Sequence, residues 1–374
     1  MDLRLTEEEK LIKNLAAQFV DKELIAREGK YLVQSAPFLP PGAPAVRELD
    51  SGVRSELIER ARQTGLWILG LPEEFGGSAM SAVARVLIHR EFGRSVLPFR
   101  PISIPEFLFE TKYGEQLAQG KISLALAFEE AHRTGELSGM RTFYRQETEG
   151  CILRDSAIFI SNPRADLFLF PAREQGTQRL GLFVIERDMP GVTIGDEVEL
   201  TTDGTVARLV LQHCRIPNEQ LLGYEYEAGA IIATEQLNIA ARSLGISMRC
   251  LAASIEHARN RVTFGRPLAQ RQAIQWMLAD LSIDIRASTW LTLEAAWRED
   301  HELIYFEEAA LAKKRAAKTA FQAADVAIQI HGGYGVCKEF PFEGFYRDAR
   351  LLRLLYGREE EIDRAMGERF LKAD

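Results

Sequence analysis

The sequence has few cysteines, and their spacing is that of neither a disulfide framework nor a metal site. The four are widely separated, without a C-x-x-C pair or paired histidines: Cys151, Cys214, Cys250 and Cys337. A small secreted scaffold or a zinc site would need closer, regular spacing. We therefore expect reduced thiols and no metal.

Long apolar runs and an excess of positive charge are absent as well. The apolar runs fall well short of the ~20 residues that span a bilayer, and the start Met1-Asp2-Leu3 does not resemble a signal peptide. We expect no membrane insertion and a cytoplasmic location. The net charge is −8, with 46 basic and 54 acidic residues well mixed, which argues against nucleic-acid binding.

The chain has 374 residues, 46% of them hydrophobic, enough for sizeable cores. Helical spacing begins near Leu5, with Thr6 and Glu9 placed as a capping box. Short apolar runs bounded by Gly, Asp, Pro and Asn follow, which indicate strands, and helical spacing then returns after Gly223. We predict an α+β protein with an N-terminal helical domain (1–120), a middle β domain (121–222) and a C-terminal helical bundle domain (223–374).

Two segments in the C-terminal third suggest a phosphate-bearing ligand. Gly332 and Gly333 sit at a helix end, where backbone N–H groups are exposed and positive φ is allowed. RVTFGRPLAQRQAIQ, residues 261–275, has an arginine and an aromatic residue between the end of one helix and the start of another. From the residues alone, a glycine C-cap and an ordinary helix junction explain these segments equally well.

Together the two segments resemble the acyl-CoA dehydrogenase family, in which R-x-x-F-G, Q-x-x-G-G-x-G and a Y-R-D-A-R helix occur in this order. The resemblance covers essentially the whole chain. It implies the acyl-CoA dehydrogenase fold and an oxidoreductase of lipid metabolism that acts on CH–CH groups. It also implies an FAD flavoprotein that passes electrons to an electron-transferring flavoprotein, and a tetramer, either a homotetramer or a heterotetramer with a paralogous subunit.

The resemblance also implies cofactor contacts. The residues placed against the FAD of a neighbouring subunit are Arg261, Phe264, Leu268, Arg271 and Gln272, with Arg261 at the pyrophosphate. Gln329, Gly332 and Gly333 correspond to residues beside the adenylate half, and Phe159, Ile160 and Ser161 to a segment beside the flavin ring; a plain strand ending in a turn is the alternative there. The family's T-E-P-x-x-G-S-D loop is altered at 128–136, where Glu129 and Gly135 are the residues that match.

The family's catalytic glutamate is replaced in this chain. Tyr356 stands at the usual position of the base that removes the α-proton, and tyrosine, with a reference pKa of ~10, is a poor base near neutral pH. Its backbone N–H is retained and can polarise a thioester carbonyl. Some relatives place the glutamate ten residues before a glycine on the helix after the β domain. Glu235 has this spacing to Gly245 and is our candidate base, with a solvent-facing carboxylate as the alternative.

Three functions are compatible with these motifs. The first is FAD-dependent α,β-dehydrogenation of an acyl-CoA, or another acyl thioester, to the trans-enoyl thioester. The second is a base-less, non-catalytic subunit of a heteromeric acyl-CoA dehydrogenase. The segments that would contact the FAD of a neighbouring subunit match the family better than the loop that would contact the chain's own flavin. The third is a flavin oxidase or monooxygenase of the same fold.

Overall fold

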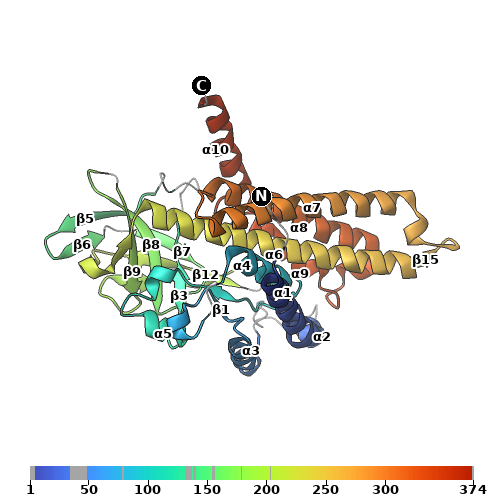
Figure 1. Ribbon diagram of the computed structural model, residues 1–374, viewed down its shortest axis with the longest axis horizontal. Helices are drawn as coiled ribbons and strands as arrows, with labels where there is room; N and C mark the ends of the chain where they lie inside the picture. Colours follow the sequence, from blue (N-terminus) through green and yellow to red (C-terminus); the bar gives the residue numbers. More distant parts are fainter. Residues whose placement is uncertain are drawn as a thin grey trace. The chain divides into compact units, whose positions relative to one another are not determined.

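The computed structural model describes residues 5–33, 49–77, 80–130, 137, 140–153, 156–177, 179–202 and 204–372 (Figure 1). Residues 131–136 of the altered loop lie outside these ranges, as does the proline-rich stretch 37–44, which the sequence predicts to be a loop. The chain forms two compact units. The helical unit comprises Met1–Leu69, Met80–Ile102 and Ala233–Leu355, and the strand unit comprises Gly70–Ala79, Ser103–Ile232 and Tyr356–Asp374.

Helices build most of the helical unit, with two short strand pairs: β1 (Ile68–Leu69) with β2 (Ile102–Ser103), and β15 (Val262–Thr263) with β16 (Arg266–Pro267). Its helices are α1 (Glu7–Phe19), the π-helical turn Val20–Ile25, α2 (Ala26–Val33), α3 (Ser51–Gln63), α4 (Ala82–Phe92), most of α6 (Glu225–Asn260), α7 (Gln272–Asp300), α8 (Phe306–His331) and α9 (Phe342–Leu352). The predicted capping box is confirmed at the start of α1, where Thr6 and Glu9 cap each other reciprocally. Figure 1 shows α7 and α8 running side by side.

Small residues bring these helices close together. The buried face of α8 is mostly alanine, so little side-chain volume separates this helix from its neighbours. On α6, a Cβ added to Gly245 would lie 2.1 Å from the backbone oxygen of Arg90 on α4. One added to Gly93, just after α4, would lie 2.3 Å from the oxygen of Arg242. These two glycines therefore fix how α6 crosses the end of α4.

Strands form most of the second unit. Its helices are α5 (Gly114–Ala118) and α10 (Glu359–Lys372), and its strands include β3 (Leu124–Leu126), β4 (Glu129–Glu130), β5 (Phe143–Glu147), β6 (Gly150–Leu153), β7 (Ser156–Ile160), β8 (Leu167–Glu174), β9 (Leu180–Glu186), β10 (Val192–Ile194), β11 (Val198–Glu199), β12 (Thr205–Leu211), β13 (Arg215–Ile216) and β14 (Leu221–Gly223). One sheet has the order β13-β6-β5-β8-β9-β14, with β3 beside β8, and the other has the order β10-β12-β7-β4, with β11 beside β12.

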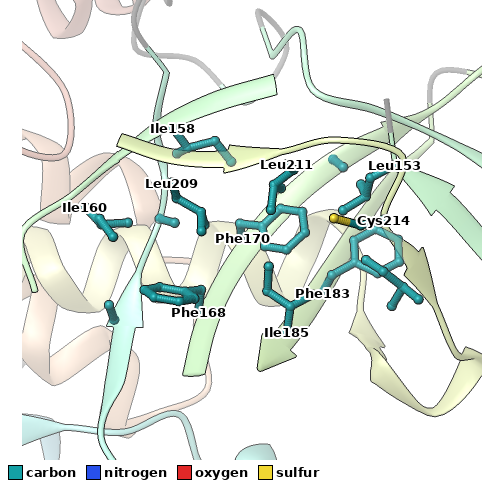
Figure 2. Packing of buried hydrophobic residues seen from close by; sticks show 14 of the residues in the cluster. Leu153, Ile158, Ile160, Phe168, Phe170, Phe183, Ile185, Leu209, Leu211 and Cys214 are labelled. Atoms are coloured by element: carbon teal, nitrogen blue, oxygen red, sulfur yellow. The ribbon is translucent and has the colours of Figure 1, made fainter. Parts of the chain in front are cut away.

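The two sheets share one apolar core, shown in Figure 2. Phe168, Phe170 and Phe183 come from β8 and β9, while Ile160 and Leu209 come from β7 and β12. All five side chains are at most 1% exposed. The α+β class and the helix–strand–helix order predicted from the sequence are therefore confirmed.

Within the described ranges, we find no helix long and apolar enough to cross a bilayer and no cluster of three or more His, Cys, Asp or Glu side chains arranged to hold a metal ion. The four cysteines all fall inside these ranges and are free thiols; Cys337 is exposed, whereas the other three are buried.

Candidate functional site

Glu235 lies on α6 in a largely enclosed position of the helical unit, with its side chain partly exposed. Burial raises the pKa of this carboxyl to about 7, against the smaller opposing effects of Asn238 and Arg85. Asn238, one turn further along the helix, donates its side-chain amide to Glu235 Oε1 at 3.1 Å. A carboxyl group with this pKa takes up and releases a proton near neutral pH, as a general base must.

The groups around Glu235 are themselves fixed. Arg85 on α4 pairs with Glu299 of α7, with 2.6 Å between the nitrogen and the carboxylate oxygen. Asp300, at the end of α7, accepts from the backbone N–H groups of Ala82 and Val83 at 2.5 and 3.1 Å and so caps α4. These charged contacts tie α4 to α7, and the side of α6 next to Glu235 packs against both helices through Ala233 and Leu237.

Tyr356 occupies a strained turn in the strand unit. Its φ is +50°, a value that a bulky residue rarely adopts, and the next residue, Gly357, has φ +104°. The backbone N–H of Tyr356 donates to Glu129 Oε1 at 3.2 Å. The N–H that we expected to polarise a thioester carbonyl therefore has a carboxylate partner within the protein.

Glu129 belongs to a row of side chains across the second sheet. It stands opposite Phe159, which in turn stands opposite Arg208. Directly opposed residues on antiparallel strands project to the same face, and the Arg208 guanidinium lies 5.7 Å from the Phe159 ring centroid. Ser161, which follows β7, is exposed, whereas Ile160 points into the core. Of the predicted flavin segment, Phe159 and Ser161 can offer side chains and Ile160 only its backbone.

The predicted arginine segment forms an exposed hairpin. Arg261 follows the last residue of α6, and β15 and β16 pair directly after it. Phe264 at the hairpin tip is 97% exposed and has φ +50°. Arg271 donates to the backbone oxygen of Thr263 at 2.6 Å and lies 5.8 Å from the Phe264 ring centroid, so this side chain stabilises the hairpin. An exposed, strained aromatic residue indicates a binding surface more than a packing site.

The glycine turn lies close to this hairpin. His257, whose backbone oxygen accepts from the Arg261 N–H at 2.8 Å, packs against His331, with 4.3 Å between the ring centroids and 33° between the ring planes. Gly332 follows His331 with φ +61°, and a Cβ added to it would meet nothing within 4 Å. Gln329 and Gly333 are exposed as well, as is Gln272, whereas Leu268 is half-buried. The two motifs that suggested a phosphate ligand therefore meet at one end of the helical unit.

Comparison with known proteins identifies the family. A family model described as the N-terminal domain of acyl-CoA dehydrogenase matches residues 6–108, and one described as the C-terminal domain of acyl-CoA dehydrogenase matches residues 223–371. The chain belongs to the acyl-CoA dehydrogenase family. Its relatives in this family are flavoproteins and oxidoreductases of CH–CH bonds, and the recognition made from the sequence is confirmed.

Two relatives in the acyl-CoA dehydrogenase family match this chain over nearly its whole length. "Acyl-CoA dehydrogenase" of Bacillus subtilis (strain 168) is 30% identical over 393 residues, covering 99% of this chain and 99% of that protein. "Acryloyl-CoA reductase (NADH)" of Anaerotignum propionicum is 29% identical over 388 residues, covering 96% and 93%. The solved butyryl-CoA dehydrogenase of Megasphaera elsdenii superposes with a TM-score of 0.82 at 24% identity, covering 100% of both chains, which shows a common fold.

Sequence reasoning missed two contacts of the candidate residues. Asn238 was visible as a polar residue one helical turn after Glu235, a spacing at which side chains meet. The contact between Glu129 and the Tyr356 N–H joins positions more than two hundred residues apart, and no local pattern reports it.

Proposed function

We propose that this chain is an FAD-dependent acyl-CoA dehydrogenase that converts an acyl-CoA to the trans-enoyl-CoA with Glu235 as the catalytic base. The observation that supports this most is the Glu235 carboxyl, whose pKa is raised to about 7 by burial and which has the spacing to Gly245 of the family's alternative base. In its ionised form Glu235 takes the α-proton of the thioester, and the electron pair of that C–H bond enters the new Cα=Cβ bond. Bound FAD supplies the acceptor for the hydride that leaves the β-carbon.

The residues present fit such a cofactor. Arg261 is exposed beside the strained Phe264 tip, and the backbone at Gly332 is open to an approaching group. A guanidinium suits pyrophosphate oxygens because its planar fork donates two parallel hydrogen bonds. Phe159 and Ser161 offer an aromatic face and a hydroxyl on the strand unit. We assign Arg261 and the Gly332–Gly333 backbone to the phosphate-bearing part of the FAD of a neighbouring subunit, and Phe159 and Ser161 to the flavin ring of the chain's own FAD.

Exposed apolar residues support assembly into an oligomer of identical chains. Trp276, Ile283 and Trp290 recur every seven residues along α7 and are 61%, 63% and 51% exposed. This spacing keeps them on one helix face, and such a stripe is typical of a helix-to-helix interface. We propose a homotetramer, as in the family, with an electron-transferring flavoprotein as the electron acceptor.

A matched set of variants tests the catalytic assignment. Glu235→Gln should retain bound flavin yet abolish anaerobic flavin bleaching by a mixture of straight-chain acyl-CoA esters, because glutamine cannot accept the proton. Glu256→Gln, an exposed residue on the same helix, is the control. Tyr356→Phe should still bleach, since the phenol is not the base. Normal bleaching by Glu235→Gln, or loss of bleaching confined to Tyr356→Phe, would contradict the assignment.

One observation favours the second function, that of a non-catalytic partner subunit. The Tyr356 N–H donates to a carboxylate of the chain itself, and the base at that position is missing. A partner subunit that is purified alone would contain no flavin. Flavin would be bound only when the chain is purified together with a more typical family member. Flavin bound by the isolated chain excludes this function.

A further inference from the structure

The side-chain amide of Asn238 sits directly on the carboxylate that the proposed function makes the base. It donates to Glu235 Oε1 at 3.1 Å from one turn further along α6, and its own side chain is 6% exposed. Both residues belong to the same continuous helix, so the pair does not depend on loop conformation. An amide N–H favours the ionised form of a carboxylate that accepts from it, because the hydrogen bond to the charged form is stronger.

We propose that Asn238 is a positioning residue for the base. By engaging Oε1, it holds the Glu235 carboxylate in one orientation and keeps it ionised near neutral pH in an enclosed position that favours the neutral acid. The α-proton is then taken at Oε2, the oxygen that Asn238 does not engage. This inference rests on the proposed function, in which Glu235 is the base.

The charged and titratable groups on the elements packed against this part of α6 do not replace Asn238. Arg85 on α4 is already paired with Glu299 of α7 at 2.6 Å, and Asp300 of α7 is committed to the α4 cap. His89, also on α4, is buried, and burial together with nearby arginines lowers its pKa to about 3.

Ahead of α8, the Tyr305 hydroxyl lies 3.5 Å from Thr234 Oγ1, on the residue before Glu235. His89 stays neutral across the range in which Glu235 titrates, so its charge does not change there. The hydrogen bond from Asn238 is therefore the contact on Glu235 that a single substitution can remove without adding or deleting a charge.

The matched pair Asn238→Val and Asn238→Thr tests this on the FAD-loaded protein. Threonine and valine have the same shape, but threonine keeps a hydroxyl donor. Two quantities are followed against pH: the rate of anaerobic bleaching by straight-chain acyl-CoA esters, and the infrared carboxyl band of Glu235, assigned by its loss in Glu235→Gln. A hydrogen bond to a charged group of roughly 1.5 kcal/mol corresponds to about one pH unit.

We expect Asn238→Val to move both midpoints upward by about that amount and Asn238→Thr, whose shorter side chain keeps a hydroxyl donor, to move them upward by less. Asn238→Ala should shift the midpoints as Asn238→Val does. It replaces the valine variant if that variant does not fold, because alanine has a high helix propensity and adds no volume. Midpoints unchanged in both the valine and the alanine variant would overturn the positioning role. The proposed function fails separately, if Glu235→Gln bleaches normally, and the infrared midpoints still decide the role of Asn238 in that case.

Discussion

A single carboxyl group defines the chemistry that this chain offers. Glu235 has the register of the family's alternative base, and the structure adds what the register alone does not give: burial, a raised pKa and an amide partner. Tyr356, at the usual base position, contributes a strained backbone whose N–H is bonded to Glu129. The spacing to Gly245 predicted the position of the base, but the protonation of Glu235 depends on burial, on Asn238 of the same helix and on Arg85 of α4.

The raised pKa of Glu235 has a consequence for stability. Burial raises the pKa from 4.5 to about 7, so between these values the folded chain binds more protons than the unfolded chain. The contribution of Glu235 to stability is therefore full below pH 4.5 and is lost as the pH rises through about 7. Glu235→Gln should be more stable than the wild type at pH 8, by up to about 3 kcal/mol, and this advantage should shrink as the pH falls toward 5.

Urea unfolding at the two pH values measures this difference. The control is again Glu256→Gln, whose exposed side chain should leave the pH dependence unchanged. An advantage of Glu235→Gln that is equal at both pH values would show that Glu235 does not titrate with a raised pKa.

Elements were predictable from the sequence where their apolar pattern was strong. The runs in β6, β7, β8, β9 and β12 predicted those strands because their side chains fill the core. The polar strand β5, with Arg145, Gln146 and Glu147, gave no such signal and is held by its pairing with β6. The β15–β16 hairpin was likewise hidden inside what the sequence indicated as a helix junction, because its turn places Phe264 at positive φ. The glycine turn follows the end of α8 as predicted, but the contact between His257 and His331 beside the hairpin joins positions 74 residues apart and leaves no local pattern.

The β15–β16 hairpin, with Arg261 just before it, is the element that we assign to FAD binding. Arg261→Ala should weaken FAD binding roughly ten- to hundredfold, as expected for one lost charge-assisted contact of about 1.5–3 kcal/mol. Because the side chain is exposed, the folded state should be unaffected. Fluorescence titration of the apoprotein with FAD measures the affinity. Arg259→Ala, two residues earlier and also exposed, is the matched control, and equal losses in both variants would argue against a specific pyrophosphate contact.

At the scale of the whole molecule, the chain has two units, each with its own core. Alanine-rich helices pack together in the helical unit, and two sheets enclose the core of the strand unit. The sequence predicted three consecutive domains with boundaries near 120 and 222; the exact division into domains stays a prediction. Helical segments from both ends of the chain enter one unit, and such long-range grouping leaves no local trace in the sequence.

Assembly is the prediction that belongs to this scale. Trp276→Glu combined with Trp290→Glu places two charges in the exposed apolar stripe of α7 and should reduce the measured mass toward the 42.1 kDa of a single chain. Light scattering after size-exclusion chromatography measures it. Lys318→Glu, an exposed charge change on α8, should leave the assembly intact. An unchanged mass in the tryptophan variant would show that this stripe is not the interface.

The central claim is that the chain is a complete dehydrogenase by itself. The most direct test is an absorption spectrum of the protein purified alone and supplied with FAD, recorded before and after anaerobic addition of mixed acyl-CoA esters. We predict bound flavin that bleaches, at a rate that rises with pH through about 7 as Glu235 ionises. Flavin that stays oxidised with every ester, or a chain that binds no flavin even when FAD is supplied, would contradict the claim.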